Sequence, residues 1–439
     1  MFLHYTSDTV ITNSVYDINV KYIVLGGEIM RAFEIFKFVN SAIVVLLTLA
    51  YLYQVIYMII GLIYRKPARL VPAKRLGRYG VFISARNEEG VIAELIGSLK
   101  KQNYPESKFD IFVLADNCTD ETAEVARKAG ANVYERFDRN QVGKGYALDY
   151  LYKEVVAKYG IDYYDGFIVF DADNLVDRNF IRMMNRTFMS GKYDAVTCYR
   201  NSKNFGSNWL SASYSLWFLR EARFVNYPRS LIGTSCMISG TGFLVSNQIM
   251  KENNGWPYHL LTEDIQFSVS CALNNKMIGY CDQAVVYDEQ PTSFMQSWKQ
   301  RLRWSKGFYQ INGKYLGSLV NSASTGKKNR MSCYDVLMTV APCMLLTIFF
   351  FGFNLLMLGW GFTMPYYLQV LFQREATKYL VYAIINSYLG MIMIGSLTVG
   401  TEWNRIKATT VEKIKYIWMF PFFMVSYIPI TLQALFSKV

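Results

Sequence analysis

The sequence predicts an α/β domain that is joined to a helical transmembrane region. Hydrophobic residues make up 52% of the 439 residues and charged residues 18%, whereas about 25% charged residues is usual in soluble domains. The long uncharged apolar stretches lie outside residues 65–335, and within that range short apolar strands alternate with helical patterns. This division predicts one globular domain flanked by membrane spans and excludes a disordered chain.

Four stretches lack charged residues and are long enough to cross a hydrocarbon core of about 30 Å. They are residues 40–64, 336–362, 379–400 and 417–436. We therefore expect the chain to divide into five parts: an N-terminal segment (1–38) that could lie at the bilayer surface, a first span (39–64), a globular domain (65–292), an amphipathic segment (293–330) and a three-span region (331–439).

Basic residues collect beside the spans, on the side of the globular domain. They are Arg65, Lys66, Arg69, Lys74, Arg75 and Arg78 after the first span, Lys327, Lys328 and Arg330 before the second, and Arg405, Lys407, Lys413 and Lys415 between the last two. This asymmetry predicts a multi-pass protein of the cell membrane with a cytoplasmic globular domain and both termini outside. The net charge of +12 then lies beside a lipid bilayer and does not indicate nucleic acid as a partner.

Within the globular domain, apolar runs of strand length alternate with helical patterns. Strands are expected at 80–84, 109–115, 131–134 and 166–170, and helices at 88–102, 119–129 and 144–158. This alternation is typical of a parallel sheet with crossover helices. Ligands bind at the carboxyl ends of the strands in such sheets, and the polar motifs at 85–89, 116–120 and 171–173 fall there.

Two later segments, residues 208–227 and 293–319, are amphipathic and rich in aromatic residues. Because charged residues interrupt both, we expect them to lie flat where the domain meets the bilayer. The alternative is that they are ordinary helices packed on the core.

Histidine and cysteine usage excludes several chemistries. The two histidines, His4 and His259, cannot supply a histidine-based zinc site, and no partners are placed for a Ser-His-Asp system. The seven cysteines are scattered without a C-x-x-C pair, which is typical of a reducing compartment.

Two acidic motifs could carry chemistry. Asp171 and Asp173 follow an apolar strand and offer oxygen ligands suited to Mg²⁺ or Mn²⁺, although such aspartates also cap helices. Glu263 and Asp264 follow Thr262 at a helix start, where a carboxylate could act as a general base or simply favour the helix N-terminus.

Cationic and aromatic residues complete the candidate set. Lys144 lies between two glycines at a helix start, without the spacing of a P-loop. In the motif from Gln300 to Trp304, Arg303 could neutralise a phosphate and Trp304 could stack on a sugar ring. An interfacial helix with snorkelling arginines is the alternative.

Taken in order, these motifs resemble those of the family 2 glycosyltransferases with the GT-A fold. The matching motifs are A-R-N-E-E at 85–89, an acidic turn at 116–120, G-K-G at 143–145, D-A-D at 171–173, G-T-G-F at 240–243, T-E-D at 262–264 and Q-x-x-R-W at 300–304. They look most like the membrane-embedded processive synthases of hyaluronan, chitin and cellulose. The resemblance covers about residues 80–306 and implies a Rossmann-like mixed sheet.

The resemblance also implies roles for the matching residues. The nucleotide part of a UDP-sugar would be bound by Ala85, Asn87, Glu88, Asp116 and Lys144, with Asp116 contacting uracil. Mg²⁺ or Mn²⁺ would be held by Asp171 and Asp173, with Asp173 favoured as the direct ligand. The residues that act in the reaction or bind the acceptor would be Glu263, Asp264, Gln300, Arg303 and Trp304, with Asp264 as the base. Gly242 would lie in the turn near the acceptor sugar. The acidic turn at 116–120 keeps only one carboxylate of the family's usual pair.

These roles imply an inverting, UDP-sugar-dependent hexosyltransferase that extends a polysaccharide. UDP-glucose is the favoured donor, ahead of UDP-N-acetylglucosamine, and the polymer would be extracellular or capsular and leave through the membrane region. Two alternatives stay open. One is transfer of a single sugar to a lipid carrier, which would make the acceptor a glycolipid. The other is a catalytically inactive transport or receptor-like membrane protein. The sequence leaves the sugar and the oligomeric state open.

Overall fold

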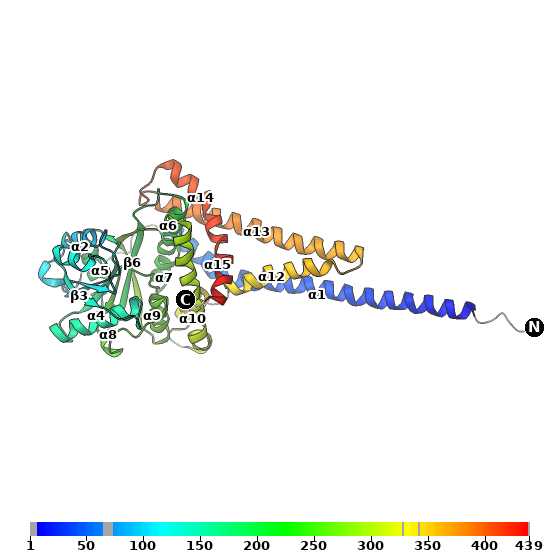
Figure 1. Cartoon of the computed structure of the whole chain (residues 1–439), viewed down its shortest axis with the longest axis horizontal. Coiled ribbons are helices and arrows are strands. Elements are labelled where there is room, and N and C mark those ends of the chain that lie inside the picture. Colours follow the sequence, from blue (N-terminus) through cyan, green and yellow to red (C-terminus); the bar gives the residue numbers. More distant parts are fainter. Residues whose placement is uncertain (1–6, 65–72, 327–328, 341–342, 438–439) are drawn as a thin grey trace, which may run out of the picture. The chain divides into compact units, whose positions relative to one another are not determined.

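A computed structural model describes residues 7–64, 73–326, 329–340 and 343–437 (Figure 1). Among the basic residues beside the predicted spans, Arg65, Lys66, Arg69, Lys327 and Lys328 lie outside these ranges. The chain forms two compact units, the first from residues 1–52 and 342–388, the second from residues 53–341 and 389–439.

The second unit is built on an eight-stranded sheet. Its strands are β1 (Tyr79–Ala85), β2 (Phe109–Asp116), β3 (Asn132–Arg136), β4 (Gly166–Asp171), β5 (Leu175–Val176), β6 (Ala195–Ser202), β7 (Phe243–Ser246) and β8 (Ile278–Asp288). The spatial order is β3-β2-β1-β4-β7-β6-β8-β5. Strands β1 to β4 pair in parallel, as predicted, whereas β7 runs antiparallel to β4 and β6. The sheet is therefore mixed.

Helices cover both faces of this sheet. They include α2 (Ile92–Lys100), α3 (Thr122–Lys128), α4 (Lys144–Tyr159), α5 (Phe180–Phe188), α8 (Asn247–Glu252) and α9 (Glu263–Leu273), with a short 3₁₀ turn, η1 (Glu106–Lys108). Alternate residues of β1 enter opposite cores: Phe82 packs with Leu151 of α4, and Ile83 packs with Leu95 of α2. The period of two in a strand produces this two-sided burial.

The predicted strands and helices of residues 80–170 are confirmed, with small shifts at their ends. The largest shift is at the helix expected from Glu88, which begins at Ile92. Asn87 takes a left-handed backbone conformation (φ 57°), and the backbone N–H of Glu88 donates to Thr122 Oγ1 at 2.8 Å. These local contacts hold residues 87–91 as a loop that faces α3.

The segment 208–227 does not have the expected surface-lying character. It forms α6 (Trp209–Glu221), a π-helical turn η2 (Ala222–Asn226) and α7 (Tyr227–Ile232). Nine of the ten residues from Leu210 to Leu219 are buried, and Trp217 is the exception. Serines at 211, 213 and 215 bond back to the helix or its cap, so their hydroxyls are satisfied inside the core. Core packing, the alternative interpretation, describes this helix. The second amphipathic segment is α10 (Phe294–Thr325).

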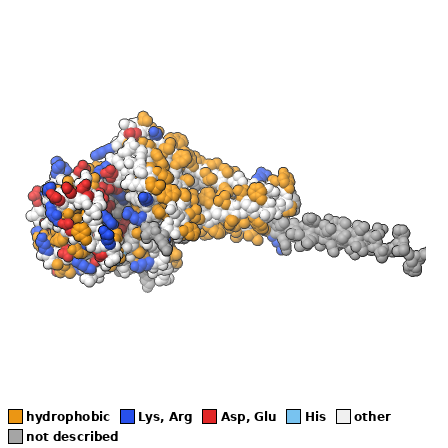
Figure 2. Space-filling model, viewed as in Figure 1, with side chains coloured by type: hydrophobic (Ala, Val, Ile, Leu, Met, Phe, Trp, Pro, Cys, Tyr) orange, Lys and Arg blue, Asp and Glu red, His pale blue; other side chains and the backbone are white. Residues whose placement is uncertain are grey.

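The first unit is helical and apolar. It contains most of α1 (Ser7–Ile63), α12 (Cys343–Gly361) and the first part of α13 (Tyr366–Glu402). Phe33 and Phe36 pack against Phe372, and the Asn354 side chain donates to Asn40 Oδ1 at 2.7 Å. Hydrophobic side chains dominate the outer surface of α12 and α13 (Figure 2), and Leu356 is 70% exposed.

Three helical stretches are long and apolar enough to cross a membrane in the part of the chain that is described. They are Met30–Ile63, Leu368–Glu402 and Thr410–Phe436. The first covers all but the last residue of the first predicted span, and the other two contain the third and fourth predicted spans. The last stretch comprises α14 (Thr410–Val425) and α15 (Tyr427–Phe436). The second predicted span, 336–362, is divided between α11 (Arg330–Val340) and α12, whose apolar part Leu346–Gly361 is shorter. A four-span arrangement stays a prediction.

Candidate functional site

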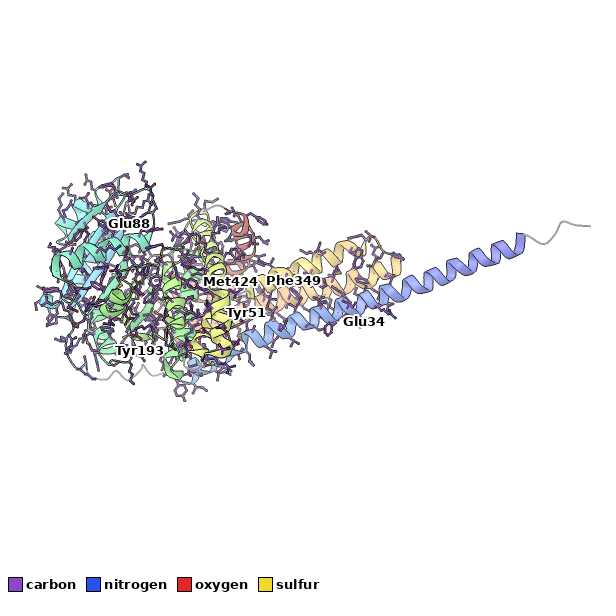
Figure 3. The ribbon with its side chains drawn as sticks, turned by 90° about the horizontal axis from the view of Figure 1, so that it is seen from below. Glu34, Tyr51, Glu88, Tyr193, Phe349 and Met424 are labelled. Atoms are coloured by element: carbon purple, nitrogen blue, oxygen red, sulfur yellow. The ribbon has the colours of Figure 1, made fainter. Side chains whose placement is uncertain are left out.

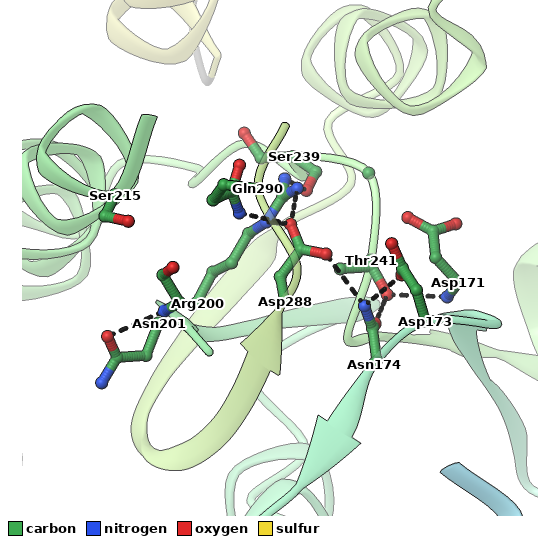
Figure 4. Close-up of polar contacts among 12 residues, drawn as sticks. Asp171, Asp173, Asn174, Arg200, Asn201, Ser215, Ser239, Thr241, Asp288 and Gln290 are labelled. Carbon is green, nitrogen blue, oxygen red and sulfur yellow. Dashed lines mark hydrogen bonds and ion pairs between the residues drawn. The ribbon is translucent and has the colours of Figure 1, made fainter. Parts of the chain in front are cut away.

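The D-x-D motif lies at the carboxyl end of β4, as the sequence predicts. Asp171 ends the strand, and its backbone N–H donates to Thr241 Oγ1 at 2.9 Å. The amide of Asn174 donates both to Asp173 Oδ1 (3.0 Å) and to Asp288 Oδ1 (3.1 Å). Asn174 therefore joins the motif to Asp288, the last residue of β8 (Figure 4).

The surroundings of Asp173 disfavour its ionised form. Burial, together with the neighbouring charges of Asp288, Asp171 and Glu88, raises its pKa to about 8. A nearby cation would favour the ionised form of such a group. Among the described residues, no three His, Cys, Asp or Glu side chains gather into a metal centre. Two carboxylates nevertheless fit a hard cation such as Mg²⁺ or Mn²⁺, because such ions commonly use one or two carboxylates and complete their shell with substrate phosphates.

Lys144 is the first residue of α4, and it faces Asp171. Its Nζ forms an ion pair with the Asp171 carboxylate and donates to the Gly240 carbonyl oxygen at 2.7 Å. The following Gly145 is required by close packing, since a Cβ there would lie 1.9 Å from the Tyr258 carbonyl oxygen. The G-K-G motif thus places a cation beside the D-x-D and lets the helix start approach a backbone loop.

Asp264 and Glu263 occupy the first turn of α9, and Asp264 is tied to the same turn as Lys144. Asp264 Oδ2 accepts from the Gly240 backbone N–H at 2.6 Å. Burial raises the pKa of Asp264, and burial together with the Asp264 charge raises the pKa of Glu263 to about 7. Thr262 makes no side-chain cap, and its hydroxyl has no hydrogen-bond partner among the described residues.

The turn from Ser239 to Gly242 connects these groups. Its backbone contacts Lys144 and Asp264 through Gly240, and the Ser239 carbonyl oxygen accepts from Arg200 at 2.8 Å. Ser239 Oγ donates to the Glu221 carboxylate at 2.6 Å, and Thr241 Oγ1 donates to Asn174. Gly242 has a left-handed φ of 67°, and a Cβ there would lie 2.4 Å from Cys198 Sγ.

Sequence reasoning missed the pair of Arg200 and Asp288. Arg200 Nε donates to Asp288 Oδ2 at 2.8 Å, the Gln290 amide donates to the same oxygen at 2.8 Å, and the guanidinium lies over the Phe218 ring. Figure 4 shows this pair beside the D-x-D. The position of Asp288 at the carboxyl end of a buried strand could have indicated a site residue. This strand, β8, was not predicted, because it lies beyond the residues where strands and helices alternate regularly.

Four of the predicted nucleotide residues, Ala85, Asn87, Glu88 and Asp116, lie at or just after the ends of β1 and β2. Asn87 Oδ1 accepts from the Thr119 backbone N–H at 2.8 Å. Ala85 is buried at the end of β1, and Glu88 lies in the loop that follows it (Figure 3). Burial and neighbouring acids, Asp171 first, raise the pKa of Glu88. Asp120 accepts from the Thr122 backbone N–H at 3.1 Å, at the start of α3.

Asp116 has a partner that the motif does not contain. Arg136, from the neighbouring strand β3, donates from Nε to Asp116 Oδ1 at 2.8 Å, and both side chains are buried. The other end of the guanidinium donates to the Gln141 carbonyl oxygen at 2.6 Å. The carboxylate predicted to contact uracil is therefore held in a buried ion pair, and Arg136 is a second residue that sequence reasoning missed.

The Q-x-x-R-W motif lies on α10. Trp304 packs edge-on against Tyr214 and Phe218, Arg303 is exposed, and the Gln300 side-chain oxygen is buried without a hydrogen-bond partner among the described residues. A Cβ at Gly307 would lie 2.6 Å from the Thr262 side chain, so α10 passes directly against the T-E-D motif.

The unmatched residue inside this motif, Arg301, is fully buried. It donates to the Phe423 carbonyl oxygen (3.1 Å) and to Ser426 Oγ (2.6 Å), and it lies over the rings of Phe423 and Tyr427. Arg301 thereby connects α10 to the junction of α14 and α15. The His259 ring stacks on Tyr146 with a centroid distance of 4.0 Å.

A mixed sheet with paired acids at its carboxyl edge defines the GT-A class of folds. The mannosyltransferase of Pyrobaculum calidifontis, solved with GDP-Man and Mn²⁺, shares this fold with a TM-score of 0.51 and 14% identity, over 90% of this chain and 99% of that one. The model of the family described as "Glycosyltransferase like family 2" matches residues 77–307. That is more than half of the chain, and the protein belongs to this family.

Two relatives of this chain are a glucosyldiacylglycerol synthase and a polysaccharide synthase by name. A beta-monoglucosyldiacylglycerol synthase of Nostoc sp. is 28% identical over 278 residues, which are 60% of this chain and 56% of the relative. A poly-beta-1,6-N-acetyl-D-glucosamine synthase of Staphylococcus epidermidis is 26% identical over 296 residues, 64% of this chain and 68% of the relative. The chain thus spans little more than half of the Nostoc relative.

Proposed function

We propose that the protein is an inverting glycosyltransferase that transfers a hexose from a UDP-sugar to a growing polysaccharide. The observation that carries this proposal is the convergence on Gly240: its N–H binds Asp264 and its carbonyl oxygen binds Lys144, which pairs with Asp171. A carboxylate, a cation and the D-x-D are thereby held around one turn. The family match and the names of the relatives support the same class of reaction.

In this proposal Lys144, Asp171 and Asp173 act on the donor, and Asp264 acts on the acceptor. Lys144 would neutralise negative charge on the diphosphate, and Asp171 and Asp173 would hold a divalent cation. When bound, such an ion stabilises the charge that develops on a departing diphosphate. Asp264 would take the proton of the acceptor hydroxyl. The acceptor oxygen then forms a bond to the anomeric carbon from the opposite face, and the bond to the UDP oxygen breaks with its electron pair staying on UDP. An α-linked donor gives a β-linked product.

The favoured donor is UDP-glucose, and UDP-N-acetylglucosamine is the second choice. The names of the Nostoc and Staphylococcus relatives include one glucosyl and one N-acetylglucosamine product. Trp304 lies on α10, the helix that packs against the T-E-D motif at Gly307, and this position supports an acceptor chain that stacks on an aromatic ring. In this proposal the domain is cytoplasmic, and the protein is anchored in the cell membrane by multiple spans.

A second candidate is the addition of one sugar to a lipid acceptor. It is favoured by the name of the Nostoc relative, whose product is a glucosylated diacylglycerol. The exposed apolar helices would bring the domain to a membrane that holds such an acceptor.

The test uses full-length protein in lipid nanodiscs with each common UDP-sugar and Mg²⁺ or Mn²⁺. We expect UDP release with one donor and a long product by size analysis; a product with a single added sugar would select the lipid alternative. Asp264→Asn should lower kcat by about 10²- to 10⁴-fold without weakening UDP binding. The matched control is Asp162→Asn, because Asp162 is 79% exposed. Full turnover by Asp264→Asn would refute the assignment of the base, and absence of UDP release with every donor would refute the enzyme proposal.

A further inference from the structure

A cavity of about 420 Å³ lies within the second unit, apart from the candidate active site. It is lined by residues of β6 and β8, the π-helical turn η2, and the ends of α1 and α13, and none of the predicted site residues contributes to its wall. Small-molecule sites in proteins are commonly about 300–1,000 Å³. The cavity is therefore large enough to hold a ligand that the proposed reaction does not use.

Charged groups from three elements meet in this cavity. Glu402, at the end of α13, is 5% exposed and accepts from the Tyr199 hydroxyl at 2.6 Å. Arg223 Nε and Arg405 Nε each lie 3.8 Å from a different oxygen of Glu402. Hydrogen bonds between such charged groups are usually about 2.7–2.9 Å. Both guanidinium groups therefore offset the charge of Glu402 without a short hydrogen bond from Nε to it. Each retains N–H donors for another group.

The Nε–H group of Arg223 is buried and has no hydrogen-bond partner among the described residues. A terminal nitrogen of the same guanidinium group donates to the Tyr64 carbonyl oxygen at 3.1 Å. Leaving a buried donor without a partner is unfavourable, so this N–H group would gain from binding an acceptor. Arg223 lies over the Tyr227 ring and Arg405 over the Tyr199 ring, so packing fixes both guanidinium groups in place before any ligand binds.

The position of the cavity indicates the source of its ligand. Leu62 lies at the end of the candidate span Met30–Ile63, and residues 396–402 end the candidate span Leu368–Glu402. Where an apolar helix of membrane-spanning length ends, phospholipid phosphates are nearby. Arginine binds phosphate oxygens through several fixed N–H donors.

We propose that this cavity binds the phosphate of a membrane phospholipid head group, between Arg223 and Arg405. The wall also contains two carboxylates, Glu402 and Asp282, so its acidic and basic side chains are equal in number. This balance favours a zwitterionic head group such as phosphoethanolamine over a multiply charged anion. The site would couple the catalytic domain to the bilayer through one bound lipid, and it does not depend on the donor or acceptor of the proposed reaction.

Native mass spectrometry of the full-length protein, titrated with phosphatidylethanolamine in detergent, tests the proposal. We expect one tightly bound lipid in the wild type and at least about tenfold weaker binding in the double variant Arg223→Gln, Arg405→Gln. The matched control is Lys415→Gln, which removes an exposed positive charge from the same polypeptide region without touching the cavity. Equal weakening by Lys415→Gln, or unchanged binding in the double variant, would overturn the proposal.

A second variant leaves every charge in place. Gly400 lines the cavity, and a Cβ there would meet no atom within 4 Å, so Gly400→Leu would fill space that the lipid needs. We expect this variant to lose the bound lipid, and retained binding would contradict the site even if the arginine variants prove unstable. Millimolar inorganic phosphate or glycerophosphoethanolamine should not displace the lipid. Displacement by either would show a soluble phosphate ligand and refute the lipid source.

Discussion

The carboxylate of Asp264 accepts a 2.6 Å hydrogen bond from the backbone N–H of Gly240. This contact joins the first turn of α9 to the turn that also binds Lys144 and Arg200. The same turn therefore contacts both the proposed base and the cation that pairs with Asp171.

The proposed base should give the reaction a characteristic pH dependence. Burial raises the pKa of Asp264 and, with the Asp264 charge, raises the pKa of Glu263 to about 7. Because a base acts in its ionised form, kcat/KM should rise with pH through the raised pKa of Asp264 and then level off. The positive charge of Lys144 lowers the pKa of Asp264, so Lys144→Gln should move the rise to higher pH. UDP release measured from pH 5 to 9 checks both; an unmoved profile in Lys144→Gln would contradict the electrostatic coupling of Lys144 to Asp264.

Lys144 should act on donor binding. Lys144→Gln leaves the Asp171 carboxylate without its ion-pair partner and the diphosphate without a cation. We expect kcat/KM for the donor to fall by about 10- to 100-fold, in line with one or two charge-assisted hydrogen bonds of about 1.5–3 kcal/mol. Lys153→Gln is the control, because Lys153 is 60% exposed and pairs with Asp149 one helical turn away. Equal losses in the two variants would argue for a general charge effect.

Gly242 should be sensitive to a single methyl group. Its φ of 67° is unfavourable for other residues, and a Cβ would lie 2.4 Å from Cys198 Sγ. We expect Gly242→Ala to destabilise the fold by about 1–3 kcal/mol, seen as a lower melting temperature. Gly90→Ala should be nearly neutral, since a Cβ there meets no atom within 4 Å. A stable Gly242→Ala variant would show that the turn can relax.

The buried pair of Asp116 and Arg136 should show strong coupling. Arg136→Gln leaves a buried carboxylate without its charged partner, which costs about 3–5 kcal/mol in comparable cases. The double variant with Asp116→Asn removes both charges and should recover part of that loss. Melting temperatures of the two single variants and the double variant measure the coupling. Additive effects would mean that the ion pair does not stabilise the domain.

Much of the site could be predicted because its residues lie at the ends of strands. Asp171, Asp116 and Asn87 follow apolar runs whose length and pattern mark them as strands, and the carboxyl ends of parallel strands meet at one edge. The partners of these residues could not be predicted in the same way. Arg136 reaches Asp116 from a neighbouring strand, and Arg200 reaches Asp288 from β6. Which residues of two paired strands lie side by side depends on their register, and this leaves no local pattern in the sequence.

The sequence by itself determined the α/β class of the domain, the apolar helices and the order of the motifs, because periodicity, charge and residue type are local properties of the chain. Only the tertiary structure decided that α6 lies in the core and not on its surface, that Asp116 is paired, and that Gly240 joins Lys144 to Asp264. Each of these depends on which distant segments come together, and that is set by burial and packing of the whole sheet.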